Sequence, residues 1–132
     1  MKNNIILESK YLRNLGGEVM KNPFSPEQNF VSFAVSYHEA IMQGDYENAN
    51  KFHKELMALR QAGTKEENAL ISSALIMHRN ESVRLWAATF LLESDSELAT
   101  QTLLKLTALQ SPLSITARII LDLWKKKKLE NS

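Results

Sequence analysis

Three histidines and a set of carboxylates are the side chains in this sequence that could bind a metal ion or act in acid–base catalysis. His38-Glu39 begins like the zinc-binding pattern H-E-x-x-H, but Met42 stands where the second histidine would be. His53 falls on an apolar helical stripe, where a histidine is more often hydrogen-bonded within a core than a ligand, and His78 directly precedes a helix start. Their spacing therefore predicts neither a metal site nor an acid–base pair.

The carboxylates favour a structural role as well. Glu93, Asp95 and Glu97 surround a predicted helix start, where negative charge interacts favourably with the helix dipole. The chain has no G-x-S-x-G turn, no phosphate-binding glycine pattern and no cysteine, which excludes disulfides and thiol chemistry. We therefore expect no catalytic residue, no metal and no cofactor, and a function that depends on binding.

The elements that carry these residues follow helical spacing. Within residues 78–92, the positions from Asn80 to Leu91 read N-x-x-V-R-x-x-A-A-x-x-L, a capping asparagine followed by apolar residues three and four positions apart. A weaker copy follows 30 residues later, in which Val83 matches Leu113 and Ala87 matches Ala117. Such a repeat is typical of stacked helices, which form binding surfaces far more often than active sites.

Six helices are predicted from their start signals. The expected starts are Ser25-Pro26, Gly44-Asp45, Thr64 with Glu67, Asn80, Ser94 with Glu97, and Ser111-Pro112. Short connections and the absence of a strand pattern predict an all-α fold of stacked antiparallel helical hairpins, HEAT/armadillo-like. We expect one domain over residues 25–126, a tail at 127–132 and an N-terminal extension at 1–24 with a short helix at 7–15.

Apolar positions predict which face of each helix is buried. The expected inward side chains are Phe30, Phe33, Ala34, Tyr37 and Ile41, then Tyr46, Ala49, His53, Leu56, Met57 and Arg60, then Ala69, Leu70, Ser73, Ile76 and Met77, then Leu98, Thr102, Leu106 and Leu109, and finally Leu113, Ala117, Ile120, Leu121 and Trp124.

The fourth predicted helix is apolar on two faces, one with Val83, Ala87 and Phe90 and the other with Leu85, Ala88 and Leu92. This pattern predicts a helix sandwiched between its own hairpin partner and the next repeat. Ile115 and Ile119 repeat it on the last predicted helix, where no further repeat follows. They are therefore predicted as an interaction or dimer patch.

Composition and charge limit the kinds of partner. With 44% apolar and 23% charged residues, the chain is ordinary for a globular domain, and no apolar run is long enough for a signal peptide or a membrane span. A cytoplasmic protein without a membrane partner is expected. Residues 25–111 hold seven basic against eleven acidic side chains, a net charge of −4. Direct nucleic-acid binding by this body is therefore disfavoured, whereas a basic protein partner would suit it.

The net charge of the whole chain is +1, and four of its cations form the run Lys125 to Lys128. We interpret this run as the end of a helix, where cations oppose the negative end of the dipole. The alternative is a weak, salt-sensitive contact with nucleic acid or an acidic membrane. Deletion of residues 125–132 without loss of nucleic-acid retention would exclude the nucleic-acid contact.

Residues 30 to about 124 resemble a bacterial family of short HEAT-like helical proteins of unknown function. The residues that carry the resemblance are Phe30, Ala34, Gly44-Asp45-Tyr46, Ala49-Asn50, Leu56, Asn80, Val83-Arg84, Ala87-Ala88 and Leu91. The resemblance implies a helical repeat fold. It also implies similarity to immunity proteins encoded beside secreted bacterial toxins, including those of contact-dependent growth inhibition systems.

Two functional hypotheses follow. The first is an immunity protein that binds and neutralises a cognate toxin, for which a basic nuclease is a suitable candidate. Its partner-binding residues would include Glu39, Asp45, Glu47, Glu81 and Glu93. The alternative is a general helical-repeat adaptor or homo-oligomeric scaffold, which would use Ile115 and Ile119 of the last helix. The sequence leaves the oligomeric state and the identity of the partner open.

Overall fold

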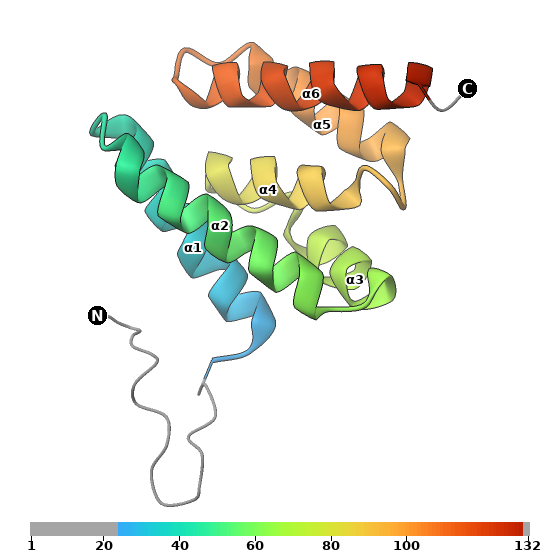
Figure 1. Cartoon of the computed structure of the whole chain (residues 1–132), viewed down its shortest axis with the longest axis horizontal. Coiled ribbons are helices and arrows are strands. Elements are labelled where there is room, and N and C mark those ends of the chain that lie inside the picture. Colours follow the sequence, from blue (N-terminus) through green and yellow to red (C-terminus); the bar gives the residue numbers. More distant parts are fainter. Residues whose placement is uncertain (1–23, 131–132) are drawn as a thin grey trace, which may run out of the picture.

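The computed structural model describes residues 24–130, so the predicted N-terminal helix at 7–15 lies outside the described residues. The described chain forms six α-helices and no strand, which confirms the predicted all-α fold (Figure 1). The helices are α1 (Pro26–Met42), α2 (Tyr46–Ala62), α3 (Lys65–Leu75), α4 (Glu81–Leu91), α5 (Ser96–Thr107) and α6 (Leu113–Glu130).

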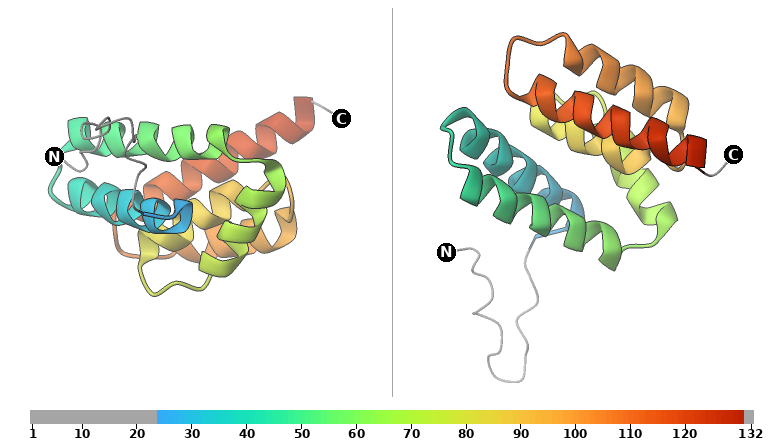
Figure 2. Two further views of the ribbon diagram at one scale, coloured as in Figure 1. Left: turned by 90° about the horizontal axis from the view of Figure 1, so that it is seen from below. Right: turned by 45° about the horizontal axis from the view of Figure 1, so that its top comes forward.

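The helices form a stack of hairpins around α4. Neighbouring helices pack in pairs, α1 with α2, α3 with α4 and α5 with α6, and α4 also contacts α1, α5 and α6. Figures 1 and 2 show the first hairpin on one side of α4 and the last hairpin on the other. None of the helices in residues 24–130 combines the length and the apolar character needed to cross a membrane.

The predicted helix starts are confirmed for α1 to α4. Ser25 and Thr64 form capping boxes with the residue three positions later, and the side chains of Asp45 and Asn80 accept backbone N–H groups of the following turn. Between α1 and α2 the chain turns at Gly44, whose φ of 73° lies in the left-handed region.

The predicted capping box of Ser94 with Glu97 is wrong. The backbone N–H of Ser94 still donates to the carbonyl oxygen of Leu91, so Ser94 belongs to the turn that closes α4. Asp95 caps α5 instead, and its carboxylate accepts the backbone N–H of Leu98 at 3.3 Å. The backbone N–H of Asp95 also donates to the carbonyl oxygen of Leu91, at 2.8 Å, so Asp95 is the residue at which the turn closing α4 meets the start of α5, and aspartate caps a helix as well as serine does.

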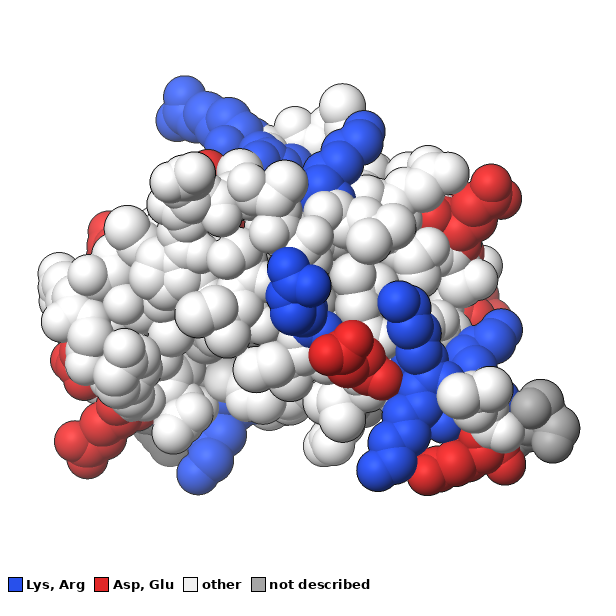
Figure 3. Space-filling view, turned by 90° about the horizontal axis from the view of Figure 1, so that it is seen from above, with Lys and Arg blue, Asp and Glu red and all other residues white. Residues whose placement is uncertain are grey.

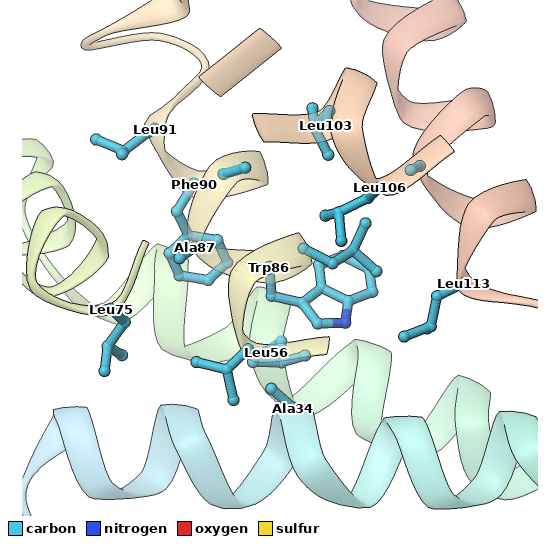
Figure 4. Close-up of a cluster of buried hydrophobic side chains, with 14 of the residues drawn as sticks. Ala34, Leu56, Leu75, Trp86, Ala87, Phe90, Leu91, Leu103, Leu106 and Leu113 are labelled. Carbon is cyan, nitrogen blue, oxygen red and sulfur yellow. The ribbon is translucent and has the colours of Figure 1, made fainter. Parts of the chain in front are cut away.

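The core is centred on α4, and the prediction that both of its faces are buried is confirmed. Val83, Leu85, Ala87 and Ala88 are all fully inaccessible to solvent. Figure 4 shows Phe90 and Trp86 among leucines from α2, α3 and α5 and from the start of α6. Helix α4 can therefore support the hairpins on both sides at once, because neither of its apolar faces is left to water.

Two aromatic contacts join α1 to α4. Phe30 meets Phe90 edge to face with ring centroids 4.9 Å apart, and Tyr37 meets Trp86 in the same way at 5.1 Å. The Tyr37 hydroxyl also lies 3.2 Å from the hydroxyl oxygen of Thr116, which links α1 to α6.

Several predicted inward positions are wrong. Tyr46, Leu70, Ser73 and Met77 are exposed, and Leu98 lies at the border of exposure. The buried side chains of α3 are instead Ser72 and Leu75, followed by Ile76, while α5 buries Ala99, Leu103 and Leu106. Helix α3 has apolar side chains on more than one face, and it packs mainly against α4, so only one narrow face is covered.

The predicted boundary of a tail at residue 127 is wrong, because α6 continues to Glu130. Lysine is a good helix former, and cations are favourable in the last turn of a helix. The ammonium groups of Lys127 and Lys128 also lie 5.8 and 5.7 Å from the ring centroid of Trp124. The inward positions predicted for α6 are confirmed, with Leu113, Ala117 and Leu121 buried.

Candidate partner-binding surfaces

The predicted acidic residues do not form one site. Glu39 is exposed on α1, Asp45 caps α2, and Glu47 and Glu81 lie in the first turns of α2 and α4. The α1–α2 connection and the start of α4 lie toward one end of the molecule, whereas α4 ends, just before Glu93, toward the other (Figure 1).

Helix starts account for most of the negative charge in residues 25–111. Asp45 and Asp95 are N-caps. The first turns of five helices contain Glu27, Glu47, Glu66, Glu67, Glu81 and Glu97. Because a helix N-terminus carries partial positive charge, these carboxylates are partly compensated where they stand. The charge excess of the body is therefore spread over several helix starts.

Glu93 is bound within the molecule. Its carboxylate accepts a hydrogen bond from the Lys127 ammonium at 2.9 Å, and its other oxygen lies 3.8 Å from the Arg60 guanidinium. The hydrogen bond and charge of Lys127, with a smaller effect from Arg60, lower the pKa of Glu93. Glu93 thus connects the end of α2 with α6, although its side chain is 46% exposed and the ion pairs are screened by water.

Two adjacent hollows lie where α2 turns into α3. The apolar groove, of about 330 Å³, is lined by Pro26, Phe30, Leu59, Ala62, Gly63, Glu67, Asn68, Leu70, Ile71 and Phe90. The polar cleft, of about 410 Å³, is lined by Met57, Arg60, Gln61, Gly63, Lys65, Asn68, Phe90, Glu93 and Ser94. Gly63, Asn68 and Phe90 belong to both, so the two hollows form one continuous candidate site.

Asn68 closely approaches Gly63 where the two hollows meet. A Cβ atom on Gly63 would lie 2.8 Å from the Asn68 side-chain oxygen, so only glycine fits without displacing it. From this position the Asn68 amide donates to the carbonyl oxygen of Arg60 at 2.8 Å. The sequence indicated the turn at Gly63 but not the hollows, since Phe30, Leu59 and Phe90 come together only in the fold.

The predicted patch on α6 is exposed. Ile115 and Ile119 are 63% and 52% exposed, and Leu123, which the sequence analysis did not single out, is 62% exposed one turn further on. Figure 3 looks down on the side of the molecule that carries α6, where residues without formal charge cover most of the left half and basic and acidic side chains adjoin near the middle. Lysine side chains gather at the end of this face near the C-terminus.

The histidines and Arg84 have structural positions. His53 is half-buried with its ring centroid 5.3 Å from that of Trp86, and burial lowers its pKa. His78 accepts the backbone N–H of Asn80 through Nδ1 at 3.0 Å. Arg84 donates to the carbonyl oxygens of His78 and Arg79, which joins α4 to the turn before it. Among residues 24–130, no group of three His, Asp or Glu side chains is placed to hold a metal ion.

Comparison of the chain with protein-family models, with curated proteins and with solved structures finds no match. The resemblance to HEAT-like proteins and to immunity proteins therefore stays a prediction from the sequence. The structure assigns the chain to the all-α proteins built from helical hairpins.

Proposed function

We propose that this chain is a protein-binding module, and that its partner is a toxin domain which it neutralises as an immunity protein. The continuous site formed by the apolar groove and the polar cleft supports binding of a protein. Its floor contains the aromatic pair of Phe30 and Phe90, and its rim carries Arg60, Lys65 and Glu93. An apolar, aromatic centre beside a polar rim is the usual composition of a protein interface. The choice of a toxin as the partner depends on the resemblance of the sequence.

In this proposal the two hollows accept different parts of the partner. An apolar side chain enters the groove beside Leu70 and Ile71, and polar groups of the partner meet the rim of the cleft. The carboxylates of Glu39, Glu47 and Glu81 contribute from a distance, because they attract a basic partner and raise the rate of encounter.

The experiment is an inhibition titration against a candidate toxin domain from a neighbouring gene. We expect an equimolar amount of the purified full chain to abolish the toxin activity. Leu70→Glu, at a groove side chain that is 74% exposed, should weaken inhibition at least about tenfold, because it places a charge in an apolar pocket. Full toxin activity in the presence of the unchanged chain would refute the immunity function.

A matched control separates the groove from general surface change. Met77→Glu alters another apolar side chain, 85% exposed, which lines neither hollow. It should leave inhibition unchanged, and both variants should keep the helical circular dichroism of the unchanged protein. If Met77→Glu and Leu70→Glu weaken inhibition equally, the groove is not the binding site.

The contribution of the acidic residues is measured separately, through the rate of association. Replacing Glu39, Glu47 and Glu81 together by glutamine should slow association and reduce its dependence on salt, with little change in the dissociation rate. Surface plasmon resonance measures both rates. An unchanged association rate would remove these carboxylates from the proposal and leave the groove to be judged separately.

A further inference from the structure

The outer side of α6 carries a narrow apolar stripe with a regular geometry. At 100° per residue, Ile115 and Leu123 lie about 40° to either side of Ile119 around the helix axis. All three are more than half exposed. The opposite side of α6 buries Leu113, Ala117 and Leu121. The last helix therefore packs one apolar face into the core and leaves a second apolar face exposed to solvent.

Two opposite charges lie along the same edge of this stripe. Arg118 and Asp122 are one turn apart, and the helical rotation places both on the same side of Ile119. Both side chains are exposed, and within residues 24–130 neither takes part in an ion pair. Between Ile115 and Leu123 this edge thus presents one cation and one anion with no net charge, and Lys125 and Lys126 follow beyond the end of the stripe.

We propose that this face of α6 binds a second copy of the same chain through a two-fold axis at Ile119. Antiparallel pairing about this axis places Ile119 against its own copy and Ile115 against Leu123 of the other copy. The same edge of each helix then faces its copy, as a closed two-fold interface requires. Arg118 comes opposite Asp122 of the other copy with an offset of only about 3 Å along the axis, a distance that an arginine side chain spans. The pairing forms twice, once on each side of the axis.

The charge distribution favours this occupant over others. A strongly acidic or basic partner gains little from Arg118 and Asp122, whose charges cancel, whereas a second copy pairs with both. The antiparallel arrangement also keeps the run Lys125 to Lys128 of one chain about 20 Å from that of the other, where a parallel arrangement would bring the two runs together. Between Ile115 and Leu123 the face is therefore self-complementary in apolar character and in charge.

Analytical ultracentrifugation of the full chain at micromolar concentration tests the pairing. We expect a dimer for the unchanged protein and a monomer for Ile119→Glu, because two carboxylates would meet on the two-fold axis. Circular dichroism should show the same helix content in both, since Ile119 is half exposed. Met77→Glu, at another exposed apolar residue away from α6, should remain a dimer. A monomeric unchanged chain, or a dimer that survives Ile119→Glu, would overturn the proposal.

The charged pair allows a more specific test. Arg118→Glu alone and Asp122→Arg alone should each weaken self-association by about tenfold, since each brings like charges together across the interface. An equimolar mixture of the two variants should restore association, because the introduced glutamate of one variant then faces the introduced arginine of the other. The unchanged Arg118 and Asp122 face each other at the second pairing. An ion pair within one helix would give the same losses but no recovery on mixing. Absence of recovery would thus exclude the proposed pairing, whatever the outcome of the toxin experiment.

Discussion

The outer faces of α2 and α6 carry side chains at the same helical spacing but of opposite character. Helix α2 presents Glu47, Lys51 and Glu55, each one turn from the next, and the shallow surface around them is lined only by polar residues. Helix α6 presents Ile115, Ile119 and Leu123 at the same intervals. One hairpin of the stack thus has the polar outer face of a capping unit, and the other does not.

The inner sides of the two hairpins are alike. The first hairpin buries Phe30 and Leu56 and the last buries Leu103 and Leu113, and both hairpins contact α4. Both hairpins therefore contribute buried apolar side chains to the same core around α4. The apolar stripe on α6 adds nothing to that core, so its character calls for an explanation in binding.

The strongest test of this equivalence is a pair of core truncations. Phe30→Ala should lower the free energy of unfolding by about 3–5 kcal/mol, and Leu113→Ala by about 2–5 kcal/mol, because each leaves a cavity beside α4. Since α4 supports both hairpins, each variant should still unfold in one transition. Urea denaturation followed by circular dichroism measures both quantities. A separate early transition for either variant would show that the two hairpins are energetically independent.

Exchange of the outer faces tests the contrast itself. Placing the stripe of α6 on α2, as Glu47→Ile, Lys51→Ile and Glu55→Leu, should create a second adhesive face and assemblies larger than those of the unchanged chain. The reverse exchange, Ile115→Glu, Ile119→Lys and Leu123→Glu, should give a monomer whose stability differs by only about 0.5 kcal/mol per site. Sedimentation velocity distinguishes them. Unchanged assembly in the first variant would mean that apolar character at this spacing is insufficient.

Features that depend on near neighbours in the sequence were predictable. Four of the helix starts followed from a capping residue and the positions just after it, as with Thr64 and Glu67. The buried faces of α4 and the exposed Ile115 and Ile119 followed from helical periodicity. For these residues the short-range pattern and the tertiary environment agree.

Features that depend on which helices meet were not predictable. In α3, Leu70 fits a helical apolar stripe as well as Leu75 does, and only packing against α4 decides that Leu75 is buried. The candidate site was not predicted from the sequence for the same reason, because Phe30, Leu59 and Phe90 come from three helices. The exposure of Glu93 was predicted but its ion pairs were not, because its partners Arg60 and Lys127 lie more than 30 residues away on either side.

Glu93 forms a charged connection between the first and last hairpins, through Arg60 and Lys127. Glu93→Gln should lower the free energy of unfolding at neutral pH by less than about 1 kcal/mol, because the ion pairs are largely exposed. The pKa of Glu93 is lowered in the fold, so the stabilisation is present above the pKa of an unfolded glutamate and is lost as pH falls through the lowered value. Urea denaturation over this acidic range measures it. Glu55→Gln on the outer face of α2 is the control, and an equal effect there would exclude a specific role for Glu93.

The smallest expected effect is a change of stability with pH that arises from His53, where the first hairpin packs against α4. The first places His53 of α2 beside Trp86, whereas the last buries leucines there. Burial lowers the pKa of His53 below the usual 6.5, since the charged ring loses water that the apolar surroundings do not replace. Stability should therefore decline as pH falls from that value through the lowered pKa and then level off. The imidazole proton resonance of His53 measures the pKa directly, and His53→Gln should flatten this part of the stability curve. A pKa of 6.5 or higher would mean that the His53 ring stays in contact with water. Helix α2 would then pack less closely against α4 than α6 does.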